Sequence, residues 1–177
     1  ILSAAATASL AMGIRQTYGL LLLPLAAEQG VAPWAFGLAV ALHNLVWGLA
    51  QPASGAMADK HGSGRVMAAG GLFYALGCGL PALWPSNTAV LLGIGLFSGI
   101  GVACAGTGLA LAAIGRLAPP EKRGEYIGIA SAGGSLGQAA MVPVTFASIG
   151  WFGATGALAM LALAALDGAL LFGGAFP

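Results

Sequence analysis

The feature that most constrains this chain is a series of long apolar runs that charged residues almost never interrupt. A helix needs about 20 residues to cross the roughly 30 Å hydrocarbon core of a bilayer. Four of the six runs contain no Asp, Glu, Lys or Arg, and the first and last contain one each. We therefore predict an all-α integral membrane protein forming one bundle of six transmembrane helices, over residues 2–27, 33–58, 66–84, 88–115, 126–149 and 151–176.

Charge is scarce throughout the chain. Only 6 basic and 5 acidic residues occur among 177, so 6% of the residues are charged and the net charge is +1. Soluble domains are typically about 25% charged, and disordered chains are more polar still. This composition excludes both classes and leaves no basic field for binding nucleic acid. The expected surroundings are a lipid bilayer.

The basic residues predict the orientation. Five of the six lie in two short connections, and the other connections contain none. Because Lys and Arg concentrate in cytoplasmic loops, we predict that loops 59–65 and 116–125 and both chain termini face the cytoplasm, across the inner membrane. The five residues are Lys60, Arg65, Arg116, Lys122 and Arg123.

Catalytic and metal-binding signatures are missing from the sequence. Cys78 and Cys104 lie inside apolar runs without CxxC or histidine spacing, which is typical of small buried hydrophobic residues. No HExxH, P-loop, Rossmann or nucleophile motif occurs. We predict that the chain is not an enzyme and uses no metal or other cofactor.

Two segments of the chain are similar at an offset of 91 residues. They are residues 37–52 and 128–143, in the second and fifth predicted helices, and they share five identities. The offset pairs two triplets of helices that begin on opposite sides of the membrane, so it predicts an inverted repeat. The identical pairs are Gly37/Gly128, Ala39/Ala130, Ala41/Ala132, Leu45/Leu136 and Pro52/Pro143.

The connection between the second and third helices carries the most specific motif. Residues 55–65, GAMADKHGSGR, resemble the G-x-x-x-D-[RK]-x-G-x-[RK]-[RK] signature of the major facilitator superfamily of transporters. Residues 120–124, PEKRG, resemble the P-E-x-R-G element of the same family. Gly64 departs from the signature, since a second basic residue is common there. The resemblance covers the chain as the amino-terminal six helices of an expected twelve.

The resemblance implies a cytoplasmic gate. In the family, the position of Asp59 contacts a helix of the other six-helix half, and Arg65 and Arg116 are candidates to join Asp59 and Glu121 in a charge network. The alternative is that these charges only fix the topology and are hydrated. The gate residues implied by the motifs are Gly55, Asp59, Lys60, Gly62, Arg65, Arg116, Glu121 and Arg123.

Within the family, residues 13–31 and 128–138 are most similar to the bacterial monocarboxylate and organic-anion branch. This implies a secondary active transporter that moves a small organic anion with protons by alternating access. Because alternating access needs a second bundle, the chain is expected to be a fragment whose carboxy-terminal six-helix half is missing. Two alternatives stay open: a six-helix half-transporter that acts as a homodimer, and a membrane scaffold that does not transport.

Arg15 is the most informative single residue. It lies about 20 Å from either end of the first predicted helix, at 1.5 Å per residue. A cation at mid-bilayer costs a few kcal/mol even on lenient scales, so it should face a cavity or a partner. A guanidinium matches a carboxylate, which predicts capture of an anionic substrate. The structural alternatives are a pair with Asp167 or hydrogen bonds to the carbonyls of a broken helix.

Other polar residues are predicted at the same depth. Tyr18 shares a helix face with Arg15, and His43, Trp47 and Gln51 are spaced to line one face of the second helix. His43 is the candidate for proton coupling, and a packing histidine is the alternative. The predicted substrate-binding residues are Arg15, Tyr18, His43, Asn44 and Gln138.

Breaks and turns have sequence candidates as well. Pro24, Pro52 and Pro143 lie inside predicted helices, where proline frees a backbone carbonyl and produces a break or a plain kink. Gly150 is the predicted turn between the fifth and sixth helices.

Overall fold

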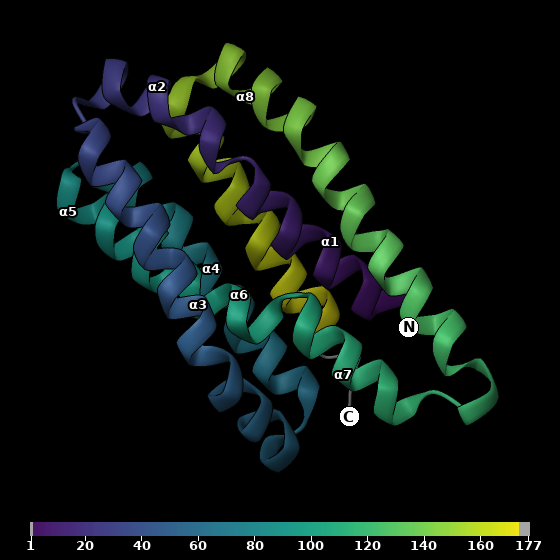
Figure 1. Cartoon of the computed structure of the whole chain (residues 1–177). Coiled ribbons are helices and arrows are strands. Elements are labelled where there is room, and N and C mark those ends of the chain that lie inside the picture. Colours follow the sequence, from purple (N-terminus) through teal and green to yellow (C-terminus); the bar gives the residue numbers. More distant parts are fainter. Residues whose placement is uncertain (1, 174–177) are drawn as a thin grey trace.

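The computed structural model describes residues 2–173, and these residues form helices and no strand (Figure 1). The prediction of an all-helical chain is confirmed for this range. The elements in chain order are α1 (Leu2–Gln16), α2 (Tyr18–Gln29), α3 (Pro33–His61), α4 (Ser63–Leu83), α5 (Asn87–Val90), the π-helix η1 (Leu91–Phe97), α6 (Ser98–Ala105), α7 (Thr107–Leu117), the 3₁₀ turn η2 (Pro120–Lys122) and α8 (Arg123–Gly173).

The first predicted helix is broken into α1 and α2. The two helices meet at Thr17 with a bend of 44°. The Thr17 hydroxyl donates to the carbonyl oxygen of Ile14 at 2.8 Å, and such a local bond competes with the regular helical ladder. The bend therefore lies beside Arg15. Pro24 lies within α2, Pro52 within α3 and Pro143 within α8, and the helix does not break at any of the three.

A single glycine separates α3 from α4. Gly62 has φ 88° and ψ 143°, a combination essentially restricted to glycine. The predicted loop 59–65 is therefore almost entirely helical, because α3 continues through His61 and α4 begins at Ser63.

The fourth predicted helix consists of several pieces. Its first part includes η1, and α6 ends at Ala105, before Gly106, where the backbone is extended until α7 begins. Glycines let this span approach α4 closely: a Cβ added at Gly101 would lie 2.8 Å from the Tyr74 nitrogen. Backbone contact of this kind requires residues without side chains.

Helix α8 turns back on itself. As one straight helix its 51 residues would extend about 76 Å at 1.5 Å per residue. Figure 1 shows instead two arms that run in opposite directions. The reversal occurs at Gly153, which has φ 67° and ψ −173°. The prediction of a turn at Gly150 is wrong by three residues, because Gly150 remains helical and only Gly153 adopts a positive φ there.

Four helical stretches of the described residues are long and apolar enough to cross a bilayer: Pro33–His61, Ser63–Leu83, Asn87–Arg116 and Pro120–Leu170. The bent pair α1–α2 makes a fifth. This count treats α8 as one helix, so it stands below the predicted six. The last predicted range, 151–176, ends outside the described residues.

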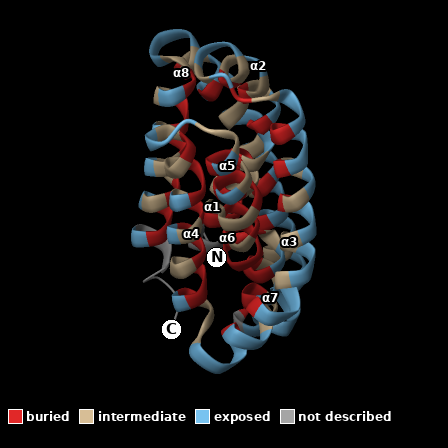
Figure 2. Cartoon of the chain, turned by 90° about the vertical axis from the view of Figure 1, so that its left-hand side faces the viewer, coloured by how far each residue is buried: buried red, intermediate tan, exposed pale blue. Residues whose placement is uncertain are grey.

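The core lies between α1, α4, α6 and the second arm of α8, whereas α3 is largely exposed (Figure 2). The first arm of α8 is largely exposed as well. Helix α1 crosses the first arm of α8 in backbone contact, since a Cβ added at Gly137 would overlap the carbonyl oxygen of Ser9. The buried Tyr74 hydroxyl donates to the carbonyl oxygen of Ala11 at 3.0 Å. Hydrogen bonds and close crossings together fix α1 at the centre.

The reversal at Gly153 can be tested by substitution. We expect Gly153→Ala to lower the free energy of unfolding by about 1–3 kcal/mol, because a side chain is strained at this positive φ. An added Cβ would also lie 2.7 Å from Oε2 of Glu28. Thermal unfolding of the purified protein measures the effect.

Gly150→Ala is the matched control. Gly150 is helical and an added Cβ would meet nothing within 4 Å, so alanine should be neutral or slightly stabilising. Equal destabilisation by both substitutions would contradict the assignment of the turn to Gly153.

Candidate functional site

The bend in the first span places two polar residues at a helix junction. Arg15 lies in the last turn of α1, and Tyr18 is the first residue of α2. A cation is favourable near a helix C-terminus, where the carbonyl groups carry partial negative charge. Arg15 is half-buried and Tyr18 is buried. The guanidinium therefore lies at the end of one helix rather than along an uninterrupted span.

Two residues of α3 hold the Arg15 head group. Its Nη2 donates to Oδ1 of Asn44 at 2.9 Å, and its Cζ lies 4.9 Å from the centre of the Trp47 ring, a cation–π contact. The Asn44 amide nitrogen donates to the carbonyl oxygen of Val40 at 2.8 Å, which orients the amide oxygen toward Arg15. Asn44 and Trp47 are three residues apart, so they share one face of α3.

His43 lies in the same turn of α3 but points into the core. Its Nδ1 is 3.1 Å from the carbonyl oxygen of Ile94 in η1. Because a carbonyl only accepts, Nδ1 carries the hydrogen, and Nε2 is left with a lone pair when the ring is neutral. The Tyr18 and His43 rings meet edge to face at 5.5 Å. Tyr18 thus links the bend to the buried histidine.

Several nitrogen atoms of this cluster are buried without a hydrogen-bond partner among the described residues. They are Nε of Arg15, Nε2 of His43 and Nε1 of Trp47. Buried polar atoms in folded proteins are rarely left unpaired. Their grouping around Arg15 makes this cluster the candidate binding site.

The structure brings together four of the five residues predicted to bind substrate. The fifth, Gln138, forms no hydrogen bond with these four among the described residues; its side chain donates to the Gly134 carbonyl of its own helix at 3.4 Å. Gln51 is exposed and lines a groove of about 390 Å³ between α3 and α7. Asp167 is exposed on the second arm of α8 and makes no bond with Arg15, so the proposed pairing of these residues is wrong.

Sequence reasoning missed the contact between Arg15 and Trp47. It grouped Trp47 with His43 and Gln51 in one stripe, but the residues that meet Arg15 are Asn44 and Trp47. The i, i+3 spacing of these two residues was the available signal.

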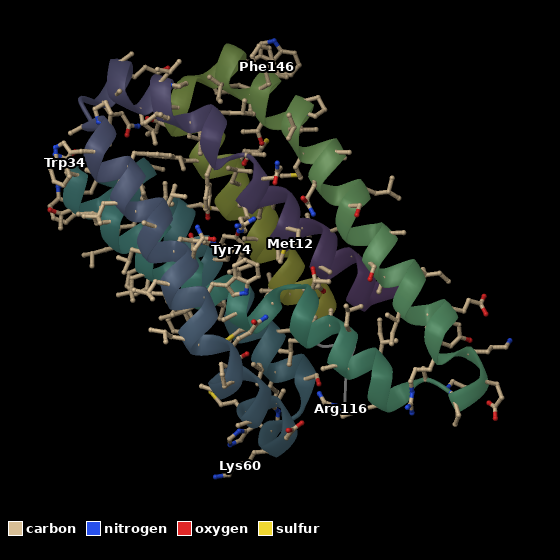
Figure 3. All side chains as sticks on the ribbon, in the orientation of Figure 1. Met12, Trp34, Lys60, Tyr74, Arg116 and Phe146 are labelled. Atoms are coloured by element: carbon tan, nitrogen blue, oxygen red, sulfur yellow. The ribbon has the colours of Figure 1, made fainter. Side chains whose placement is uncertain are left out.

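A second charged cluster lies at one end of the bundle, where Lys60 and Arg116 are labelled in Figure 3. Arg116 forms an ion pair with Asp59, and its Nη2 donates to the Ser63 hydroxyl at 3.0 Å. Asp59 lies in the last turn of α3, where a negative charge is unfavourable, so Arg116 compensates it. Both side chains are well exposed, and such pairs contribute at most about 1 kcal/mol. The pair therefore serves mainly to position the end of α7 against the turn between α3 and α4, and it contributes little to the free energy of unfolding.

The wider charge network does not form. Arg65 and Glu121 are exposed and join no ion pair among the described residues. Lys60 and Arg123 are also exposed. Of the predicted four-residue network, only the pair of Asp59 and Arg116 is present.

Comparison with known proteins identifies one family. The family model described as Major Facilitator Superfamily matches residues 3–177. A comparison with curated proteins finds no match. The family match covers both clusters and every helix described above.

Proposed function

The chain belongs to the major facilitator superfamily, whose members move small molecules across membranes, and on that premise we propose that it transports a small organic anion such as a monocarboxylate together with protons. The cycle is alternating access between two bundles of helices. The observation that carries the proposal is the arrangement around Arg15: a cation within a bent span, held by an amide oxygen and an aromatic face.

Arg15 lacks an acidic partner among the described residues. An uncompensated charge in a low-dielectric setting is costly, and an anionic substrate would compensate it. Asn44 occupies one N–H group and Trp47 covers one face of the guanidinium. The Nε–H group and the remaining N–H groups could then bind the two oxygens of a carboxylate as a fork.

We propose six spans arranged as two inverted triplets. The reversal at Gly153 supports this count, since it divides α8 into arms of 30 and 20 residues, each long enough to cross a bilayer. Gly62 and Gly153 are 91 residues apart, the offset of the sequence repeat, and both turn the chain at a positive φ. They would occupy equivalent turns in the two triplets.

The proposed orientation places the basic end in the cytoplasm of the cell, with both chain termini there and the bundle in the inner membrane. The exposed face of α3 carries the polar side chains of Asn44 and Gln51. Lipid solvates such groups poorly. We propose that a second six-helix bundle covers this face, either the remainder of a longer chain or a second copy.

Cysteine labelling tests the orientation. Single cysteines at Pro85 and Glu121 would both be exposed, while Cys78 and Cys104 are buried and should react little. In intact cells we expect an impermeant maleimide to label Pro85→Cys at once and Glu121→Cys only after the membrane is permeabilised. Labelling of both positions from outside would refute the topology.

Substitution of Arg15 tests the anion site. We expect Arg15→Lys to weaken binding of monocarboxylates by about 10- to 150-fold, because an ammonium keeps the charge but loses the fork. Arg15→Ala should weaken binding further. Affinity for a panel of monocarboxylates and the melting temperature are measured on the same purified variants.

Arg65→Lys is the control: Arg65 is exposed and joins no ion pair among the described residues, so the substitution should change neither quantity. If Arg15 only packs the helices together, its substitution should lower the melting temperature and leave the anion affinity unchanged. An Arg15→Ala protein that melts early and still binds every anion with wild-type affinity would end the proposal.

His43 is the proposed proton carrier. Ile94 holds its Nδ1–H, so Nε2 is the atom that can take up a proton. In proteoliposomes containing the full-length transporter, we expect His43→Gln to retain anion counterflow and to lose accumulation driven by a pH gradient. Undiminished proton-driven accumulation would exclude His43 from coupling.

A further inference from the structure

The two ends of the bundle carry matching contacts. At one end, Arg116 from the last turn of α7 contacts Asp59 and Ser63, on either side of the turn at Gly62. At the other end, Oε2 of Glu28 from the last turn of α2 accepts a hydrogen bond from the backbone nitrogen of Ala154 at 2.7 Å. This second contact lies directly after the turn at Gly153.

The matching contacts agree with the repeat offset. Ser63 and Ala154, which receive the two side chains, are 91 residues apart, as are Gly62 and Gly153. In the proposed arrangement, α2 ends the first helix of one triplet and α7 ends the first helix of the other. In each triplet, a side chain at the end of the first helix therefore contacts the turn between the second and third helices of the other triplet. One such contact lies on each side of the membrane.

The chemistry of the Glu28 contact is that of a helix cap. Ala154 begins the second arm of α8, where the first N–H groups have no partner within the helix. A carboxylate there accepts a charge-assisted bond and faces the positive end of the helix dipole. The capping residue, Glu28, is 126 residues away from Ala154 in sequence. The neighbouring Gln29 adds a bond from its Nε2 to the Thr155 hydroxyl at 2.7 Å.

The contact restrains the far end of α2. Helix α2 meets α1 at the bend at Thr17 and buries Tyr18, Leu21 and Leu25 in the core. Its far end is held by Glu28 and Gln29 and, through the following turn, by the Ala32 nitrogen, which donates to Oδ1 of Asn87 at 2.8 Å. Because Tyr18 begins α2, the position of α2 sets the position of Tyr18 beside Arg15.

We propose that Glu28 is a clasp that fixes α2 against the second arm of α8, as the inverted counterpart of Arg116 at the other membrane face. The two clasps make the triplets move as one rigid body. Without Glu28, α2 pivots about Thr17 and Tyr18 leaves its place. Glu28 is thus a positioning residue, and this role does not depend on which substrate is carried.

Hydrogen–deuterium exchange of the protein in lipid nanodiscs tests the clasp. We expect exchange within residues 150–158 to rise about tenfold in Glu28→Ala, and less in Glu28→Gln, whose amide oxygen still accepts a hydrogen bond. Residues 59–66 should be unaffected. Arg116→Gln should raise exchange in residues 59–66 and leave residues 150–158 unaffected. Glu125 is exposed, and Glu125→Gln should leave exchange in both segments unchanged.

Spin labels test the pivot. Ala27→Cys and Ala159→Cys are exposed positions on α2 and on the second arm of α8. Pulsed EPR should give one narrow distance distribution for the otherwise wild-type protein, and a broad one when Glu28 is changed to Ala or Gln. Wild-type exchange at residues 150–158 in Glu28→Ala overturns the clasp. A distance distribution that stays narrow in both variants overturns the pivot.

Discussion

Inside a bilayer every backbone N–H and C=O group must find its hydrogen bond within the protein, and this requirement governs where the helices of this chain can break. At Thr17 the side chain bonds the Ile14 carbonyl. At Gly106 the amide nitrogen still donates to the Val102 carbonyl at 2.8 Å. At Gly153 the freed amide of Ala154 receives the carboxylate of Glu28. Each of these breaks thus has a hydrogen-bonding partner nearby, and those at Thr17 and Gly153 also bring polar side chains together.

Close packing determines which of these places become buried. Glycines bring α1 against α8 and α4 against α6 until backbone atoms touch, and these crossings fill the centre of the bundle. The bend at Thr17 then directs Arg15 toward α3, while Tyr18 and His43 remain in the core. One turn of α3 consequently presents an amide to the cation on one side and an imidazole to η1 on the other.

The sequence predicted what depends on local pattern. Apolar runs located the helices, and the motif at residues 55–65 predicted the family, which is confirmed. The positions of the helix breaks were harder to predict. Gly150 and Gly153 are both glycines in the same short stretch of sequence, and only the folded structure distinguishes the one that turns the chain. The depth of Arg15 in its predicted helix indicated that Asn44 lies near it. The contact of Arg15 with Trp47 was not predicted, because it depends on the bend angle at Thr17. Nothing in the sequence indicated the contact made by Glu28, since its partner is a backbone group distant in sequence.

The π-helical segment η1 carries a consequence for the register of the fourth span. Hydrogen bonding from i to i+5 accommodates one more residue per turn than an α-helix does, so a π segment is the trace of an inserted residue. Removing one residue between Leu91 and Phe97 would regularise the helix. The parts of the span on either side would keep nearly the same orientation, whereas an α-helix that retained every residue would rotate everything beyond this segment by about 100° and shift it by about 1.5 Å. In that second case the glycines that admit α4 would face a different direction, so the π geometry of this segment keeps the later part of the fourth span in register with α4.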